Sequence, residues 1–281
     1  MYETFYHLQA KPFQLSPDPA FLFASHGHKR AMAYLMYGVH QGEGFIVITG
    51  EIGAGKTLLV STLARKITTQ AFVLAQIVSS SLDADDLVRT VAARFGLPQE
   101  ENKAALLSRI EQYLLACHRQ GKRALLIVDE AQNLPMKSIE ELRMLSNFLS
   151  DGKPLLQTFL LGQPEFRRTL MRPELEQLRQ RITATCHLGP LDEPETKGYI
   201  LHRLKTAGWR DDPSFSSDAF AAIYTHTGGV PRRINTLCDR LLLMGRLDEK
   251  HAFTAVEVGD VIKELQQEFA PMEFRTQSLG A

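Results

Sequence analysis

The chain has 281 residues, of which 44% are hydrophobic and 23% are charged, so it can form one large domain or two modest ones with a buried core. Lys plus Arg number 32 and Asp plus Glu number 32, which argues against a global basic field for nucleic acid or anionic lipid, although a local patch stays open. The three cysteines form neither a CxxC pair nor a cluster with histidines, so we expect reduced thiols in a reducing compartment.

Targeting signals are the next feature of the sequence. The N-terminus lacks a basic segment followed by an apolar stretch, so a signal peptide is not expected. The longest apolar runs, such as 124–128, are only strand-length, whereas a membrane span needs about 20 residues. The sequence therefore predicts a soluble cytoplasmic protein without a membrane span of its own.

The first elements begin with a proline-rich segment. Residues 1–25 contain three prolines between aromatic residues, which predicts an ordered extended arm rather than a helix. Residues 27–40 have the pattern of a helix. Residues 45–49 are a short β-branched run typical of a fully buried parallel strand, and a glycine loop and a helix to about residue 69 follow it.

Strands and helices then alternate up to about residue 190. Alternation of this kind predicts a parallel sheet with helices on both faces, which is an α/β fold. The further predicted strands cover 71–78, 124–128, 155–161 and 182–188, and the further predicted helices cover 83–95, 103–120 and 138–149.

Beyond residue 190 the strand pattern stops and only helices are predicted, at 194–207, 217–226, 231–246 and 255–269. Thr254 and Glu257 have the spacing of a capping box for the last helix. We therefore predict an arm at 1–25, an αβα core at 26–190, a helical lid at 191–269 and a tail at 270–281, mobile because it has few apolar residues.

The segment Gly50–Thr57 matches the pattern GxxxxGK[ST] and has the strand before it and the helix after it that a phosphate-binding loop requires. Glycines let successive backbone N–H groups turn toward a triphosphate, and the following helix adds its positive dipole end. Lys56 is expected to reach the β- and γ-phosphates, and Thr57 to ligate Mg²⁺. The predicted nucleotide-binding residues are Gly50, Glu51, Ile52, Gly53, Ala54, Gly55, Lys56, Thr57 and Leu58.

A second acidic motif ends the predicted strand at 124–128. Asp129 and Glu130 follow that strand at the sheet edge where ligands of such folds bind. Asp129 is predicted to hold Mg²⁺ through its waters, and Glu130 to polarise the attacking water. Alone, two acids in this place could equally form a helix N-cap; after a complete phosphate-binding loop, the catalytic interpretation is favoured.

Several motifs together resemble one known family. The two nucleotide motifs, the run LLIVDEAQ, the segment at 229–233 (GVPRR), the segment at 162–166 (GQPEF) and the opening pattern at 6–19 resemble the AAA+ ATPases of the secretion-pathway A type. The similarity covers roughly residues 1–268 and is strongest to the secretion ATPases of exosortase/PEP-CTERM exopolysaccharide loci. It implies ATP hydrolysis with Mg²⁺, a nucleotide-dependent homo-oligomer, ring or filament, and a membrane-bound secretion or export partner, with the chain peripheral at the inner face of the cell membrane.

The same resemblance implies roles for three further residues. Gln163 corresponds to the sensor-1 position, and Arg232 to sensor 2 on the lid. Arg181 corresponds to an arginine finger that enters a neighbouring subunit's site, and Arg179 is the second candidate for that role. The ordinary alternatives are a polar turn residue for Gln163 and a solvated helix face for Arg181. Phe13 and Leu15 are expected either to pack near the adenine or simply to dock the arm on the core. One branch of the family continues into a transmembrane helix and a wall-binding part, and because neither follows Ala281, we expect no direct role in cell-wall remodelling.

Two other functions remain open from the sequence. A DNA-associated ATPase of the transposition-regulator type shares the same core, but the balanced charge and the absence of a helix-turn-helix pattern make nucleic acid a disfavoured partner. A nucleotide-gated scaffold with little turnover would keep the nucleotide-binding site but would not use ATP hydrolysis to drive a partner. The pair of carboxylates favours catalysis over this scaffold.

Overall fold

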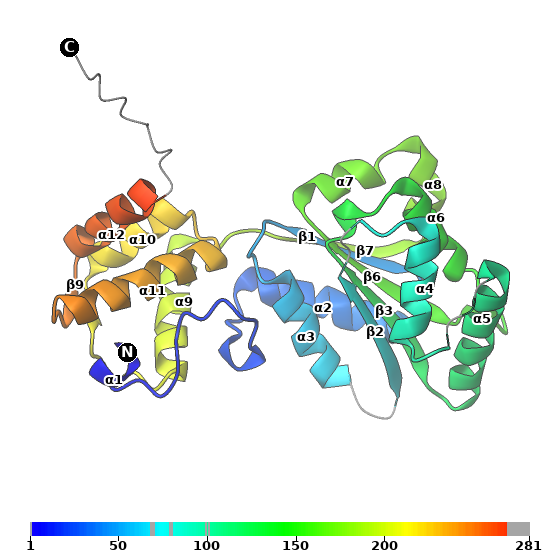
Figure 1. The fold of residues 1–281 in the computed structure, drawn as a ribbon, viewed down its shortest axis with the longest axis horizontal. Coiled ribbons are helices and arrows are strands. Elements are labelled where there is room, and N and C mark those ends of the chain that lie inside the picture. The colour runs from blue at the N-terminus through cyan, green and yellow to red at the C-terminus, as the bar shows by residue number, and fades with distance from the viewer. Residues whose placement is uncertain (1, 68–70, 79–80, 99, 101, 269–281) are drawn as a thin grey trace, which may run out of the picture. The chain divides into compact units, whose positions relative to one another are not determined.

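The computed structural model describes residues 2–67, 71–78, 81–98, 100 and 102–268. They form two compact units (Figure 1). The first is residues 17–190, and the second combines residues 1–16 with the segment from Leu191 onward. The predicted arm at 1–25 is thus divided between the two units.

The first unit is built on a five-stranded parallel sheet with the strand order β2-β3-β6-β1-β7. The three central strands are almost entirely buried, as expected for continuous apolar runs. The predicted parallel α/β sheet is therefore confirmed. The strands are β1 (Phe45–Gly50), β2 (Phe72–Val78), β3 (Arg123–Asp129), β6 (Leu156–Gly162) and β7 (Ile182–Leu188).

Helices cover both faces of this sheet (Figure 1). Side chains alternate along each strand, so Ile46 and Ile48 pack with α2 and α3, whereas Phe45 and Val47 pack with the opposite cluster. The helices are α2 (His26–Gln41) and α3 (Lys56–Ile67) on one face, and α4 (Ala84–Arg94), α5 (Lys103–Arg119) and α6 (Met136–Leu145) on the other.

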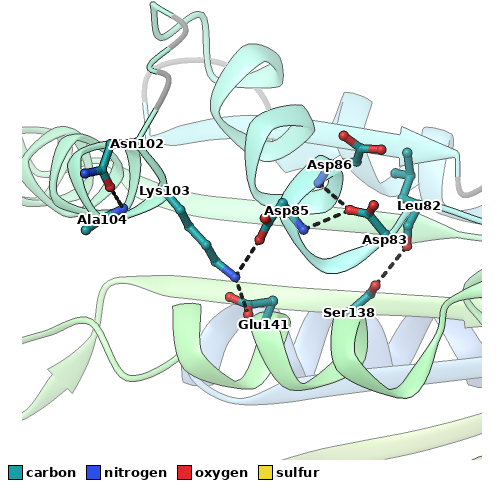
Figure 2. Close-up of polar contacts among 9 residues, drawn as sticks. All are labelled: Leu82, Asp83, Asp85, Asp86, Asn102, Lys103, Ala104, Ser138 and Glu141. Carbon is teal, nitrogen blue, oxygen red and sulfur yellow. Dashed lines mark hydrogen bonds and ion pairs between the residues drawn. The ribbon is translucent and has the colours of Figure 1, made fainter.

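Polar contacts join the three helices of the second face (Figure 2). Lys103 at the start of α5 forms ion pairs with Asp85 of α4 at 3.0 Å and with Glu141 of α6 at 2.7 Å. The side chain of Asp83 caps α4 by accepting from the N–H groups of Asp85 and Asp86. These contacts connect the first turns of α4 and α5 with α6.

Short elements account for most differences from the predicted ones. The predicted helix at 138–149 starts earlier and ends at Leu145, and a small hairpin follows it, with Asp151 and Gly152 at positive φ in its turn. Elements of two to seven residues give too little periodicity to be predicted. Those without a predicted counterpart are α1 (Tyr2–Phe5), η1 (Pro19–Phe21), η2 (Ala131–Asn133), β4 (Leu149–Ser150), β5 (Lys153–Pro154), α7 (Pro164–Leu170), η3 (Pro173–Leu175) and α8 (Glu176–Arg179).

The second unit is helical. Its elements are α9 (Glu193–Thr206), β8 (Ser214–Phe215), α10 (Ser217–Thr227), α11 (Pro231–Leu247), β9 (Ala252–Phe253) and α12 (Ala255–Glu268). The parallel pair β8–β9 contradicts the expectation that strands stop at residue 190, because a two-residue pair leaves no pattern in the sequence. The predicted tail at 270–281 lies outside the described residues. Within the described part of the chain, no helix has the length and apolar character that a bilayer crossing requires.

The first residues of the chain are held by this helical unit. The Tyr6 hydroxyl donates to the Lys250 carbonyl at 2.8 Å, and the guanidinium of Arg203 donates to the carbonyls of Pro12 and Gln14. Phe13 is buried, whereas Leu15 is exposed. Residues 2–5 form the helix α1, so the prediction of a wholly extended arm is wrong at its start.

The predicted capping box of α12 is formed. The backbone N–H and the hydroxyl of Thr254 both donate to Glu257 Oε2, at 2.8 and 2.6 Å, and the same hydroxyl oxygen accepts from the Val256 N–H. The hydrogen bonds from Thr254 lower the pKa of Glu257 to about 2. The helix therefore keeps an ionised cap at neutral pH.

Two consecutive glycines form the turn between α10 and α11, and they give a matched pair of substitutions. Both have positive φ, 59° at Gly228 and 70° at Gly229. A Cβ at Gly229 would lie 1.9 Å from the Leu191 carbonyl oxygen, whereas a Cβ at Gly228 would meet nothing within 4 Å. We therefore expect Gly228→Ala to lower the free energy of unfolding by about 1 kcal/mol and Gly229→Ala by about 3 kcal/mol.

Urea unfolding followed by circular dichroism measures both losses. Equal losses in the two variants would contradict the steric argument and leave only the common cost of the left-handed backbone.

Candidate functional site

The phosphate-binding loop lies between β1 and α3, as predicted. Gly53 and Gly55 have φ angles of 82° and 96°, a region that residues with a side chain rarely adopt. A Cβ at Gly50 would lie 2.6 Å from the Leu188 carbonyl oxygen of β7. The glycines of the motif are therefore required by the backbone path and by the close approach of the neighbouring strand.

Lys56 is the buried cation of this loop. Its Nζ donates to the Gly50 carbonyl at 2.7 Å and to the Glu51 carbonyl at 3.1 Å. Burial lowers the pKa of the Lys56 ammonium, and the nearby carboxylates of Glu130 and Asp129 oppose this shift. The ammonium thus lies inside the loop that is predicted to receive the phosphates.

The acidic motif meets the loop at the carboxyl ends of β1 and β3. Thr57 Oγ1 donates to Asp129 Oδ2 at 2.6 Å, and Asp129 Oδ1 accepts the Glu130 backbone N–H at 2.9 Å. Asp129 is 4% exposed. A hydroxyl and a carboxylate oxygen are the donor types that Mg²⁺ prefers, so these two side chains fit the predicted metal position.

Glu130 occupies an unusual backbone conformation at the end of the motif. Its φ is 54°, in the left-handed region that few non-glycine residues adopt, and such strain clusters at functional sites. Gln163 Nε2, from the end of β6, donates to Glu130 Oε2 at 3.2 Å. The structure therefore brings the predicted sensor-1 residue to the predicted catalytic carboxylate.

Two residues of this region did not stand out in the sequence. Gln132 donates to Glu130 Oε2 at 2.6 Å and accepts from the Gln163 backbone N–H at 2.9 Å. Gln132 is the last residue of the run LLIVDEAQ, but that pattern gave it no role of its own. His28 lies in the first turn of α2, and its Nδ1 shares a hydrogen bond with Ser25 Oγ at 2.8 Å. Its Nε2 faces the phosphate-binding loop so closely that a Cβ added at Gly55 would lie 2.9 Å from it. His28 reaches the site only through folding, because it lies 27 positions before Gly55.

One of the two predicted arginines, Arg181, lies apart from this cluster within the same unit. Arg181 precedes β7 at the opposite edge of the sheet, where its Nη1 donates to Ser146 Oγ at 2.8 Å and its carbonyl accepts from the Phe45 N–H. Five residue steps along β1 separate that edge from Gly50, or about 16 Å. Arg181 therefore does not join the phosphate-binding loop of its own chain.

Arg232 belongs to the helical unit. It is exposed in the first turn of α11, directly after Pro231. With Arg233, His226 and Leu265 it lines an open groove of about 520 Å³. The sensor-2 role of Arg232 stays a prediction.

The fold and the site define a class of protein. Residues 39–170 match the AAA domain family. The chain resembles the solved structure of the ORC2 protein from Aeropyrum pernix with a TM-score of 0.69 at 17% identity, over 91% of this chain and 72% of that one. It also resembles the RuvB branch migration motor of Thermotoga maritima, with a TM-score of 0.55 at 18% identity over 85% of this chain and 68% of that one. The chain has the P-loop AAA+ fold.

Two curated proteins show sequence similarity. The chain is 40% identical over 245 residues to general secretion pathway protein A of Aeromonas hydrophila, covering 86% of this chain and 44% of that protein. It is 33% identical over 109 residues to the Mu-like prophage FluMu DNA transposition protein B of Haemophilus influenzae, covering 39% of this chain and 36% of that protein. The chain thus spans less than half the length of either relative.

Proposed function

We propose that this chain is an ATPase whose hydrolysis of ATP drives or switches a membrane-associated secretion or export system. The observation that carries the ATPase part is the convergence of Lys56, Thr57, Asp129 and Glu130 at one edge of the sheet, with Thr57 and Asp129 in direct contact. The secretion part is supported by 40% identity to general secretion pathway protein A over most of the chain. The finer assignment, to an exopolysaccharide export locus, rests on the sequence resemblance alone.

Each residue of the site has a distinct role in ATP hydrolysis. Glu130 accepts a proton from water as the water oxygen bonds to the γ-phosphorus, and the bond between that phosphorus and the β–γ bridging oxygen breaks to release ADP. Lys56 and the backbone N–H groups of the loop stabilise the charge on the phosphate oxygens. Thr57 and Asp129 would hold Mg²⁺, which when bound neutralises part of the triphosphate charge.

Arg181 supports a shared site in a homo-oligomer. It lies about 16 Å from its own phosphate-binding loop, so a phosphate that it contacts belongs to another copy of the chain. A membrane-bound partner at the inner face of the cell membrane would then receive the conformational change. The Mu-like relative makes a DNA-associated ATPase the second candidate.

Steady-state ATP hydrolysis, measured against protein concentration with and without double-stranded DNA, tests the proposal. We expect turnover per subunit to rise with concentration and to be unaffected by DNA. Strong stimulation by DNA would favour the transposition-type function instead. No turnover under any condition would favour a nucleotide-gated scaffold.

The export role has its own test in cells. Deleting the gene from its native host should lower the amount of exported polymer or protein, and the wild-type gene should restore it. A gene carrying Glu130→Gln should not restore export; restoration by this variant would separate the export role from hydrolysis.

A further inference from the structure

A glutamine, Gln132, follows the acidic motif, and its role as inferred below rests on the proposed ATPase function. Gln132 lies in η2, two residues after Glu130, and its side chain is half-buried. Both ends of its amide are used: Nε2 donates to Glu130 Oε2 at 2.6 Å, and Oε1 accepts from the Gln163 N–H at 2.9 Å. The orientation of the amide is therefore fixed, because a flipped amide would place oxygen against the carboxylate and N–H against N–H.

The contacts of Gln132 close a ring of three hydrogen bonds. The third bond runs from Gln163 Nε2 to the same carboxylate oxygen, Glu130 Oε2, at 3.2 Å. Since both donors use Oε2, Oε1 is the oxygen that we expect to accept from the attacking water. The ring therefore fixes the plane of the carboxylate, which sits on a strained backbone with φ of 54°.

The ring also ties the carboxylate to the start of α7. Gln163 is the residue before Pro164, the first residue of that helix, and Pro164 has no N–H of its own to offer. Phe166 packs against Gly162, where an added Cβ would lie 2.9 Å from the Phe166 Cβ. The backbone N–H that Gln132 binds therefore belongs to a firmly packed turn.

We propose that Gln132 is a positioning residue, which holds the Glu130 carboxylate in line for the attacking water and couples it to the sensor-1 segment at Gln163. A charge-assisted hydrogen bond of this length holds an acceptor firmly, and misplacing a catalytic group by about 1 Å can cost about 100-fold in rate. Within the described residues, the hydrogen bonds of Gln132 go to Glu130 and Gln163, and not to the loop or to the predicted metal ligands. It therefore acts on the chemical step and not on nucleotide affinity.

The test separates kcat from KM for ATP in Gln132→Ala, Gln132→Glu and the surface control Gln112→Ala, whose glutamine donates to Ser108 on α5. Gln132→Ala should lower kcat about 10- to 100-fold and leave KM within about twofold. Gln132→Glu should lower kcat by at least the same factor, because it keeps the length of the side chain but puts a second carboxylate beside Glu130. Gln112→Ala should match the wild type.

Three outcomes of this kinetic test would overturn the inference: unchanged kcat in Gln132→Ala, a rise in KM alone, or recovery of activity in Gln132→Glu, which would indicate that the side chain only fills space. In the Glu130→Gln background, Gln132→Ala should give no further loss of residual turnover, whereas an independent structural role would add its own loss.

A measurement without turnover tests the contact itself. The side-chain amide resonance of Gln132 in ¹⁵N-labelled protein should lie downfield of that of Gln112 and move back when Glu130 is replaced by Ala. A Gln132 resonance unaffected by Glu130→Ala would overturn the inference even if the wild type hydrolyses ATP. A wild type without turnover would contradict the proposed function. The Gln132 resonance would then test only whether the hydrogen bond between Gln132 and Glu130 exists.

Discussion

Replacing Glu130 with Gln should lower the steady-state rate of ATP hydrolysis by about 10²- to 10⁴-fold, the range in which a general base contributes. The amide keeps the shape of the side chain but cannot accept the proton of the attacking water. Nucleotide affinity should stay within a few-fold, because Lys56, Thr57 and Asp129 keep their contacts with one another and with the loop.

Hydrolysis and equilibrium binding of a fluorescent ATP analogue measure the two effects separately. Glu264→Gln, on an exposed position of α12, is the matched control and should behave as the wild type. Full turnover in Glu130→Gln would exclude Glu130 from the chemistry and leave it the role of the N-cap residue that precedes η2.

Replacing Arg181 with Ala should lower turnover by about 10³-fold in the assembled enzyme, because an arginine finger supplies transition-state charge stabilisation of this order. The fold should tolerate the change, since the side-chain hydrogen bond that Arg181 forms with the described residues is the one to Ser146 at 2.8 Å, and one such bond contributes little to stability. An unchanged melting temperature would show that the loss is not one of folding.

Mixing two inactive variants tests whether Arg181 acts in the site of a neighbouring subunit. In a mixed oligomer, an Arg181→Ala subunit keeps Glu130 and can receive Arg181 from a neighbouring Glu130→Gln subunit. The mixture should therefore hydrolyse ATP faster than either variant alone. Arg179→Ala is the comparison, because Arg179 Nη1 donates to the Leu170 carbonyl and is the reserve candidate. Loss in Arg179→Ala with full activity in Arg181→Ala would transfer the role to Arg179.

The helical unit shows where sequence patterns were informative. The helices α9 to α12 were predicted to within a few residues at each end. This was possible because α11 and α12 have a strong apolar period and several of the four have clear terminal signals, such as Pro231 and the Thr254 capping box. The β8–β9 pair was missed, since each strand is two residues long and its partner lies 38 positions away. Short pairings depend on the packing of the helices around them.

Sequence patterns alone predict the parallel α/β core, the phosphate-binding loop and the acidic pair at Asp129 and Glu130, because these features are local. A buried strand, a glycine turn and a helix start are each encoded by neighbouring residues.

The residues that surround the acidic pair depend on how the whole unit folds. Gln132 and Gln163 are 31 positions apart, His28 and Gly55 are 27 apart, and Arg181 meets Phe45 at the opposite edge of the sheet. Such contacts follow from the strand order β2-β3-β6-β1-β7, in which β6 lies between β3 and β1. A local pattern does not encode that order, because it results from the global packing of strands and helices.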